Sequence, residues 1–407
     1  ELLGTLQDLL VEEKPTASQW AIFGCVILFC TVPVFSSTGL VRFLSWVYAA
    51  ILLCYFAYSF ITSKPLFSDG FFREICEAVF AVPFANFSAA PKCVAVPFAN
   101  KEKGEKMDSK RITALRAIMK REGIDYYYIP TADFHESEYV VEYFKARKFI
   151  TGFTGSAGVA VIGQEEAWLW TDGRYFIQAA TQIEGSGFGL MKMGQEGVPT
   201  VMQYLGEKLQ EGQCIGFDAR VVNTNDAKEF AKIAAKKHGS LKTDKDLLDE
   251  VWTDRPALVH QPADVLKDEF NGEATASKLA RVREQMEKED AQYHIISTLD
   301  DIAWILNVRG NDIPHVPVVL SFLVIGKEDA MWFVEENALS DAVKEMAAEC
   351  GITIRPYEDV YAYAATIPEH SSVLLDKRKV NYRITNALSE TVHIVSKANP
   401  SQLMKAI

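Results

Sequence analysis

Two pairs of matching segments, separated by nearly the same number of residues, constrain the fold of this chain more than any other feature. The segment "LARVREQMEKEDAQYHIIS" (279–297) repeats the pattern that begins at "ITALRAIMKREG", and Met286 follows Met119 by 167 residues. A second pair, "VIGQEEAWLW" (161–170) and "VIGKEDAMWF" (324–333), is offset by 163 residues. Two unrelated matches at nearly one offset indicate a duplicated domain.

Each copy is expected to be an α/β domain with a mixed sheet flanked by helices. In the first copy, "ITALRAIMKREG" has the apolar spacing of a helix that stops at Gly123, and "IDYYYIP" follows as a buried strand. The second matched pair consists of strand, glycine-centred turn and strand, so hairpins alternate with helical crossovers. We predict domains over 107–253 and 257–398, joined near "VWTDRP", with a short final stretch over 399–407.

The first 106 residues have a different character. Two apolar runs, "WAIFGCVILFCTVPVF" (20–35) and "LVRFLSWVYAAILLCYFAYSFI" (40–61), predict a membrane hairpin over 20–61, because the second is long enough to span a bilayer. The alternative is a buried or artefactual apolar segment. A repeated "AVPFAN" then forms a linker. We interpret 1–106 as a fusion, an anchor or a gene-boundary error, and expect membrane association only if 20–61 is genuine.

Charge and cysteine usage narrow the partners and the compartment. A net charge of −12 argues against nucleic acid as the main partner, because phosphate binding needs a basic face. Beyond residue 100 the only cysteines are Cys214 and Cys350, which give neither a disulfide framework nor a zinc spacing. The region 107–407 is therefore expected to be cytoplasmic.

A glycine-rich segment, "TGFTGSAGVAVI" (151–162), could be mistaken for a phosphate loop. Such a loop needs a strand before it and a helix after it, and the nucleoside triphosphate version also ends in a lysine and a hydroxyl residue. Here a strand follows and no lysine is present. We therefore predict a tight turn where backbone segments approach closely.

Two further motifs contain histidine beside carboxylates. "DFHESEY" surrounds His135 with three acids, but no second histidine is near, so we favour a loop close to a substrate cleft over a metal site. Asp133 is expected to cap a following helix, with Glu136 closing a capping box. "RGNDIPHVPV" places Asp312 and His315 on a proline-stiffened, structural loop. No catalytic residues and no metal ligands are assigned from these motifs.

Several motifs together resemble those of the three-domain Xaa-Pro aminopeptidases. "IPTADFHESEYV", "ARKFITGFTGSAGVAVI", "WTDGRYFIQAATQ" and "LMKMG" are similar to the first domain of that family. "DEVWTDRPA" and "TLDDIAWILNVRGNDIPHVPVVLSF" are similar to the second. The resemblance runs in order over 110–407. It implies two creatinase N-terminal-like domains that precede a "pita-bread" catalytic domain.

The same resemblance implies an activity and its location. The family removes an amino-terminal residue when proline follows, using two divalent metals, commonly manganese, in the third domain, and its members are often homodimers. The final "VSKANPSQLMKAI" (395–407) matches the lead-in to that third domain. We therefore expect a portion that is inactive alone and serves substrate gating and subunit contacts. The alternative is a non-enzymatic binding or assembly module, either free or tethered to a membrane.

One residue stands out for binding by this resemblance. In the family the arginine of the "TDGRY" turn helps to bind the peptide, which makes Arg174 the main candidate, with His135 and Tyr175 as secondary candidates. Asp172 and Gly173 are expected to form the turn, and Trp170 and Tyr175 to pack around the arginine. The alternative is that Arg174 only pairs with a neighbouring carboxylate.

Overall fold

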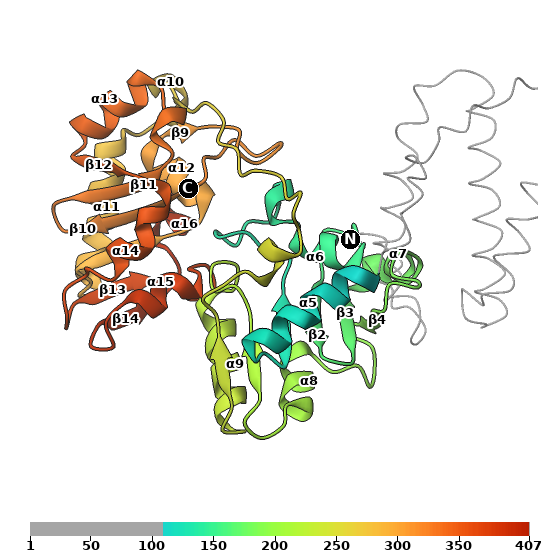
Figure 1. Cartoon of the computed structure of the whole chain (residues 1–407). Helices are drawn as coiled ribbons and strands as arrows, with labels where there is room; N and C mark the ends of the chain where they lie inside the picture. The colour runs from blue at the N-terminus through green and yellow to red at the C-terminus, as the bar shows by residue number, and fades with distance from the viewer. Residues whose placement is uncertain (1–108, 407) are drawn as a thin grey trace, which may run out of the picture. The chain divides into compact units, whose positions relative to one another are not determined.

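The computed structural model describes residues 109–406, which form two α/β domains (Figure 1). The chain divides into two units, Glu1–Asn100 and Lys101–Ile407, and all described residues belong to the second. The predicted membrane hairpin over 20–61 and the linker up to 106 lie outside the described residues. Among the helices that are described, none combines the length and the apolar character needed to cross a bilayer.

Domain one is built on a six-stranded mixed sheet. Its strands are β1 (Tyr126–Ile129), β2 (Val159–Gly163), β3 (Ala167–Thr171), β4 (Gly189–Lys192), β5 (Cys214–Gly216) and β6 (Ser240–Lys242). They lie in the order β4-β3-β2-β1-β5-β6. Strand β2 is antiparallel to both of its neighbours, β1 and β3. The remaining pairs, β3–β4, β1–β5 and β5–β6, are parallel.

Helices cover both faces of this sheet. One face carries α5 (Ser109–Glu122), α6 (Ala146–Thr151) and α7 (Phe176–Gln182), and the other carries α8 (Val201–Lys208) and α9 (Thr224–Ala235). Short 3-10 turns are η2 (Glu142–Phe144), η3 (Gly173–Tyr175) and η4 (Leu247–Glu250).

Domain two repeats the arrangement. Its strands are β8 (Tyr293–Ile296), β10 (Ser321–Gly326), β11 (Ala330–Val334), β12 (Ile352–Arg355), β13 (Ser372–Leu375) and β14 (His393–Ser396), in the order β12-β11-β10-β8-β13-β14. Its helices are α10 (Asp268–Asn271), α11 (Thr275–Lys288), α12 (Leu299–Leu306), α13 (Asp341–Glu349), α14 (Val360–Ala364), α15 (Tyr382–Ala387) and α16 (Pro400–Met404). A small ribbon pairs β7 (Asp264–Val265) with β9 (Val308–Arg309), and η5 (Glu336–Ala338) and η6 (Tyr357–Asp359) complete the domain.

The duplication predicted from the sequence is confirmed down to the strand register. Tyr126 of β1 pairs with Gly163 of β2, and Tyr293 of β8 pairs with Gly326 of β10 in the same antiparallel sense. The strand orders of the two sheets match position by position. The mixed-sheet α/β class is likewise confirmed.

Local sequence explains the first helix and strand. Leu115 and Met119 are fully buried on one face of α5, and the helix ends before Gly123, whose φ of 64° favours a residue without a side chain. Along β1, Tyr127 belongs to the core under α5, whereas Tyr128 faces the opposite side and packs against Phe230 at 4.8 Å between ring centroids. This alternation is the period of two expected of a strand that is buried on both faces.

The two domains meet through equivalent loops, residues 218–225 after β5 and 376–383 after β13, which we call the paired loops. Four backbone hydrogen bonds join them: Thr224 N to Val380 O (3.0 Å), Tyr382 N to Val222 O (2.8 Å), Asn225 N to Lys377 O (3.0 Å) and Arg383 N to Ala219 O (3.1 Å). The first and second bonds are equivalent, and so are the third and fourth, because each residue of one bond corresponds to a residue of the other in the opposite domain. An antiparallel bridge between Asn223 and Asn381 lies at the centre. The contact therefore has approximate two-fold symmetry.

The same asparagines begin the helices that follow. Asn223 Oδ1 accepts a hydrogen bond from Asp226 N at the start of α9, and Asn381 Oδ1 accepts one from Ile384 N at the start of α15. In addition, Asn381 Nδ2 donates to Phe134 O at 2.9 Å. One side chain thus caps a helix of domain two and holds a loop of domain one.

Each domain also contributes an aromatic ring to the other. Phe134, from the loop after β1, is buried in the domain-two core that contains Leu320 and Phe322. In return, Tyr382 packs near Phe217 of domain one, with 6.3 Å between the ring centroids. These exchanges fix the loop after β1 relative to both sheets.

Substitution of Asn381 by alanine tests the contact between the domains. Asn381→Ala removes the helix cap and leaves Phe134 O without its donor, so it is expected to lower the free energy of unfolding by about 2 kcal/mol. Urea denaturation of the full chain measures the change. The matched control is Asn337→Ala, an exposed asparagine, with an expected change below about 0.5 kcal/mol. Equal effects would contradict the importance of the contact.

A buried histidine predicts acid sensitivity of domain two. His294 in β8 donates from Nδ1 to Leu374 O at 3.0 Å, and burial lowers its pKa to about 4. Because the folded-state pKa lies below the ordinary value, the unfolded chain binds the proton first, and stability falls as the pH drops below about 6.5. Between pH 7 and pH 5 this group alone is expected to cost about 2 kcal/mol.

The variant His294→Leu should lack this component. The measurement is the free energy of unfolding of both proteins at pH 7 and pH 5, because the difference between their two slopes isolates His294 from the carboxyl groups. Parallel slopes would show that His294 does not titrate in this range.

Candidate functional site

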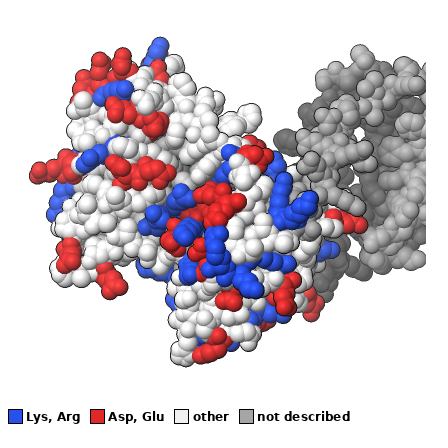
Figure 2. Space-filling model, viewed as in Figure 1, with Lys and Arg blue, Asp and Glu red and all other residues white. Residues whose placement is uncertain are grey.

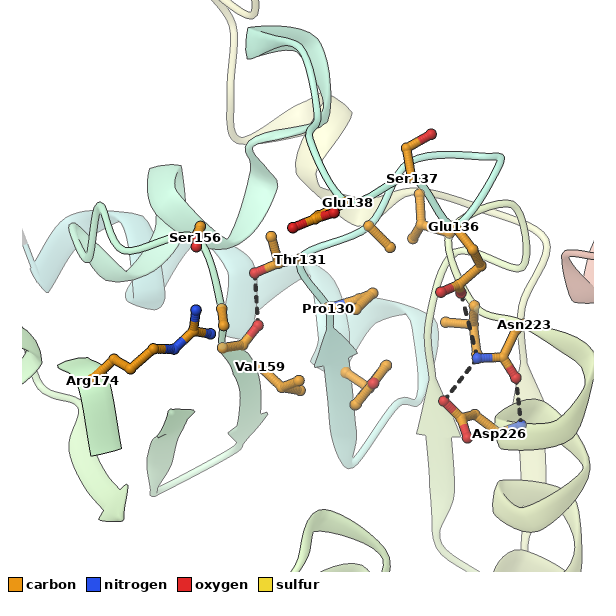
Figure 3. Close-up of a pocket in the computed structure, with 16 residues that line it drawn as sticks. Pro130, Thr131, Glu136, Ser137, Glu138, Ser156, Val159, Arg174, Asn223 and Asp226 are labelled. Carbon is orange, nitrogen blue, oxygen red and sulfur yellow. Dashed lines mark hydrogen bonds between the residues drawn. The ribbon is translucent and has the colours of Figure 1, made fainter. Parts of the chain in front are cut away.

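The loops that follow β1 and β3 and that precede β2 and α9 surround one cavity of about 380 Å³, which we call the arginine cavity. Figure 3 shows Arg174 entering it from one side, while Glu136, Asn223 and Asp226 lie on the other and Ser156 and Glu138 lie between. The residues around the cavity come from four separate stretches of domain one. The fold of this domain, rather than any single motif, brings them together.

Arg174 is held by its own turn. Asp172 accepts hydrogen bonds from the backbone N of Arg174 (3.0 Å), from Nε (3.0 Å) and from Nη2 (2.8 Å). The predicted turn over Asp172 and Gly173 is therefore confirmed, as η3. The bonds with Asp172 raise the pKa of Arg174 and lower that of Asp172.

This pairing leaves much of the guanidinium accessible. The side chain of Arg174 is 69% exposed, against 35% for Asp172. Hydrogen bonds to described residues use Nε and Nη2, so the N–H groups of Nη1 are available to a ligand. The carboxylate partner expected in the alternative is present, and it orients the guanidinium without covering it.

Of the two rings expected around Arg174, one is there. The guanidinium carbon lies 5.2 Å from the centroid of the Tyr175 ring, and the Tyr175 hydroxyl lies 2.8 Å from Ser156 Oγ. That hydrogen bond lowers the pKa of Tyr175. Trp170, by contrast, is turned into the core, where Nε1 donates to Pro199 O. The expectation that Trp170 packs around the arginine is wrong, because its ring packs beneath α8, with 5.2 Å between the centroids of the Trp170 and Tyr204 rings.

The glycine-rich segment is a close-packed turn, as predicted. A Cβ atom on Gly155 would lie 2.2 Å from the ring of Phe153 and 2.9 Å from that of Tyr175. At Gly158 it would lie 2.9 Å from Trp170 O. The absence of side chains at these positions lets the segment approach β3 and the turn of Arg174, and β2 follows it directly.

The far end of the arginine cavity is acidic, which the sequence did not reveal. Asn223 Nδ2 donates to Asp226 Oδ2 at 3.0 Å and to Glu136 Oε1 at 3.4 Å. Burial raises the pKa of Glu136 to about 7 and raises that of Asp226. Glu136 is distant in sequence from Asn223 and Asp226, and only the N-cap pattern of Asn223 could have drawn attention to this end.

The capping box predicted for the loop after β1 is wrong. Asp133 Oδ1 accepts from the backbone N of His135 (2.9 Å) and of Ser137 (3.0 Å), but no helix begins there. Glu136 adopts a left-handed φ of 55° and turns toward Asn223. The acceptor pattern of an aspartate in a turn was mistaken for a helix cap.

His135 lies between the domains. It is 1% exposed, with Nδ1 at 2.9 Å from Ser297 O and Nε2 at 2.6 Å from the Tyr357 hydroxyl. Because a carbonyl only accepts, Nδ1 carries the proton and the tyrosine donates to Nε2. Burial lowers the pKa of His135, which favours this neutral form. Both ring nitrogens are therefore engaged by domain two.

The second histidine motif is a structural loop, as expected. Asp312 is buried and accepts from the backbone N of Gln261 (2.5 Å) and of Leu320 (2.7 Å). His315 is exposed at a left-handed φ of 67°. Across the described residues, no group of three or more histidine, cysteine, aspartate or glutamate side chains could hold a metal ion.

Comparison with protein families identifies the class. Residues 111–250 match a model of the creatinase/prolidase N-terminal domain, and residues 254–407 match a second model of the same description. The chain therefore belongs to the family of creatinase/prolidase N-terminal domains and carries two of them in tandem.

The relatives are Xaa-Pro aminopeptidases. A probable Xaa-Pro aminopeptidase P of Coprinopsis cinerea is 36% identical over 290 residues, which is 70% of this chain and 46% of the relative. Aminopeptidase P2 of Arabidopsis thaliana is 35% identical over 281 residues, 68% of this chain and 39% of the relative. The chain spans about half the length, or less, of these relatives.

A solved structure agrees with the sequence comparison. The X-prolyl aminopeptidase of Caenorhabditis elegans, described as a cytosolic enzyme with a di-nuclear active site, matches with a TM-score of 0.69 and 31% identity. The match covers 74% of this chain and 51% of that one.

The close packing of the glycine-rich segment can be tested with two glycine substitutions. Gly155→Ala is expected to destabilise domain one by about 1–3 kcal/mol, because the added methyl group overlaps two rings. The control, Gly206→Ala within α8, meets nothing within 4 Å and is expected to stabilise by about 0.5–1 kcal/mol. Thermal unfolding measures both, and changes of the same sign would contradict the packing described for Gly155.

Proposed function

We propose that this chain is the N-terminal portion of an Xaa-Pro aminopeptidase, in which it admits and orients peptides that have proline at the second position. The observation that carries the proposal is the ordered match of both domains to Xaa-Pro aminopeptidases, which includes a structure at a TM-score of 0.69. The division into domains over 107–253 and 257–398 belongs to the same proposal.

Arg174 is the residue proposed to contact the peptide. A guanidinium that is pre-oriented by Asp172 offers planar N–H donors at small entropic cost, and a peptide carbonyl or carboxylate is their natural acceptor. Ser156 lines the same cavity near Arg174, and its hydroxyl group, which is hydrogen-bonded to the Tyr175 hydroxyl, can accept from a peptide N–H.

His135 contributes in a different manner. Its nitrogens bind Ser297 and Tyr357, so it holds the loop after β1 against domain two and thereby fixes one side of the arginine cavity. We propose that it positions the site, and that Tyr175 is the nearer of the two secondary candidates to a bound peptide.

The chemistry is proposed to belong to another part of the enzyme. By family resemblance, two divalent metals, with manganese as the preferred ion, bind in a catalytic domain outside this chain and activate water for attack on the peptide bond. The di-nuclear active site described for the nematode relative supports this. We further propose that the region 107–407 is cytoplasmic, forms homodimers within the whole enzyme and is inactive alone.

The role of Arg174 is tested by kinetics of the full-length enzyme that contains this region. Arg174→Ala is expected to lower kcat/KM for an Xaa-Pro peptide roughly ten- to a hundredfold while metal content stays unchanged, because a charge-assisted hydrogen bond to the peptide is lost. The matched control is Arg378→Ala, since Arg378 is tied to Asp376 in the same way and its side chain is 66% exposed. Similar losses in both variants would remove Arg174 from the site.

A second assay asks whether the chain acts without a catalytic domain. The full chain is incubated with an Xaa-Pro peptide and added manganese, and release of the first residue is measured. No release is expected. Turnover would overturn the assignment of chemistry to another domain. Peptide binding, together with a gene that encodes no catalytic domain after this region, would favour the non-enzymatic binding module.

A further inference from the structure

A second cavity, of about 270 Å³, adjoins the arginine cavity and differs from it in charge. The two cavities share Thr131, Glu138 and Ser156 as lining residues. The second is also lined by the basic side chains of Lys145, Arg147 and Lys148 and by His315, and we call it the basic cavity. On the face shown in Figure 2, basic and acidic side chains gather close together where the two domains adjoin.

Arg147 is the central observation, because it is a buried cation without a carboxylate partner. It is 3% exposed, and its donors reach Thr131 Oγ1 at 2.9 Å, Phe153 O at 2.5 Å and Gly155 O. No described aspartate or glutamate lies within ion-pair distance of it. Burial lowers its pKa to about 10. Since three of five N–H groups are used, two donors and a full charge remain beside the cavity.

The two lysines add charge that the surroundings only partly balance. Lys145 and Lys148 share a single carboxylate, Glu142, to which Lys148 is bound loosely at 3.5 Å. Their side chains are 34% and 44% exposed, so they can turn toward a ligand. Among the residues that line the cavity, Glu138 is the one carboxylate. Its charge also raises the pKa of the neighbouring Arg174, although Asp172 raises that pKa more. Three basic side chains thus outnumber the carboxylates beside them.

Domain two closes the cavity with a rigid loop. Pro314 and His315 come from the loop that Asp312 holds by accepting from two backbone N–H groups. A bridge between Ile313 and Val316 tightens it further. In either tautomer the His315 imidazole presents one N–H donor, so it can add a hydrogen bond to an acceptor in the cavity. Because the loop is already held in place, little conformational entropy is lost in it when a ligand binds.

We propose that the basic cavity is a binding site for a carboxylate or phosphate group, with Arg147, Lys148 and His315 as its donors. The shared wall makes a peptide in the arginine cavity the favoured source, through its terminal carboxylate or an acidic side chain; this source rests on the proposed function. A free anion such as phosphate presents the same chemistry and is the other source.

The test uses isothermal titration calorimetry on the full chain. The probes are inorganic phosphate and one Xaa-Pro peptide in two forms, with a free and with an amidated carboxyl end. Phosphate is expected to bind saturably and to compete with the free-acid peptide, which should bind roughly tenfold tighter than its amide. Absence of saturable phosphate binding overturns the anion site.

Variants locate the binding. Lys148→Gln and His315→Asn, in which asparagine tolerates the left-handed φ, should each weaken phosphate and free-acid peptide about two- to fivefold and leave the amide unchanged. The control Lys232→Gln removes a lysine that is paired with Glu229 three residues away and should change nothing. A phosphate affinity that is unchanged in both Lys148→Gln and His315→Asn overturns the assignment to this cavity.

Two further comparisons separate this proposal from the proposed function. Arg174→Ala should weaken both peptide forms but leave phosphate affinity intact; loss of phosphate binding as well would overturn the separateness of the two sites. Equal affinity for the free-acid and amidated peptides would overturn the peptide source alone. If neither peptide form binds, the result counts against the proposed function. The phosphate titrations with the Lys148 and His315 variants then still decide whether the anion site exists.

Discussion

The four reciprocal backbone hydrogen bonds between the paired loops are the constraint on which the rest of the described structure depends. They fix domain two against domain one at the ends of β5 and β13, close to the start of α9, which lines the arginine cavity. Asn381 then holds the loop after β1 through Phe134 O, and His135 anchors the same loop on Ser297 and Tyr357. Both cavities are lined by part of this loop, so their shape follows from how the domains are joined.

Within residues 109–406, one type of local turn occurs three times, and it serves different roles. In each of three D-x-R turns, an aspartate at position i accepts from the backbone N and the guanidinium of the arginine at i+2. Arg220 is partly covered and lies over the Phe134 ring, which makes it part of the domain contact. Only Arg174, of these three, lines the arginine cavity. The turn alone therefore does not mark a functional arginine, whereas its surroundings do.

Sequence patterns predicted what depends on neighbours along the chain. The helix up to Gly123, the buried strand after it and the repeated hairpin all follow from local periodicity, and the duplication follows from comparing two such stretches. The prediction for the loop after β1 was wrong because the residues that this loop contacts lie far away in the sequence. Glu136 is hydrogen-bonded to Asn223, and His135 to Tyr357. The charge of Arg147 was overlooked for the same reason, since its burial depends on the fold of the glycine-rich segment.

The symmetry of the paired loops has a consequence for how the molecule responds to dilution. Self-complementary contacts of this type commonly join separate subunits, and their occupancy then varies with how much protein is present. Here both halves belong to one polypeptide, so each loop meets its counterpart at a fixed effective concentration set by the connecting chain. The pairing that shapes both cavities is thereby a property of a single molecule, even at the lowest abundance.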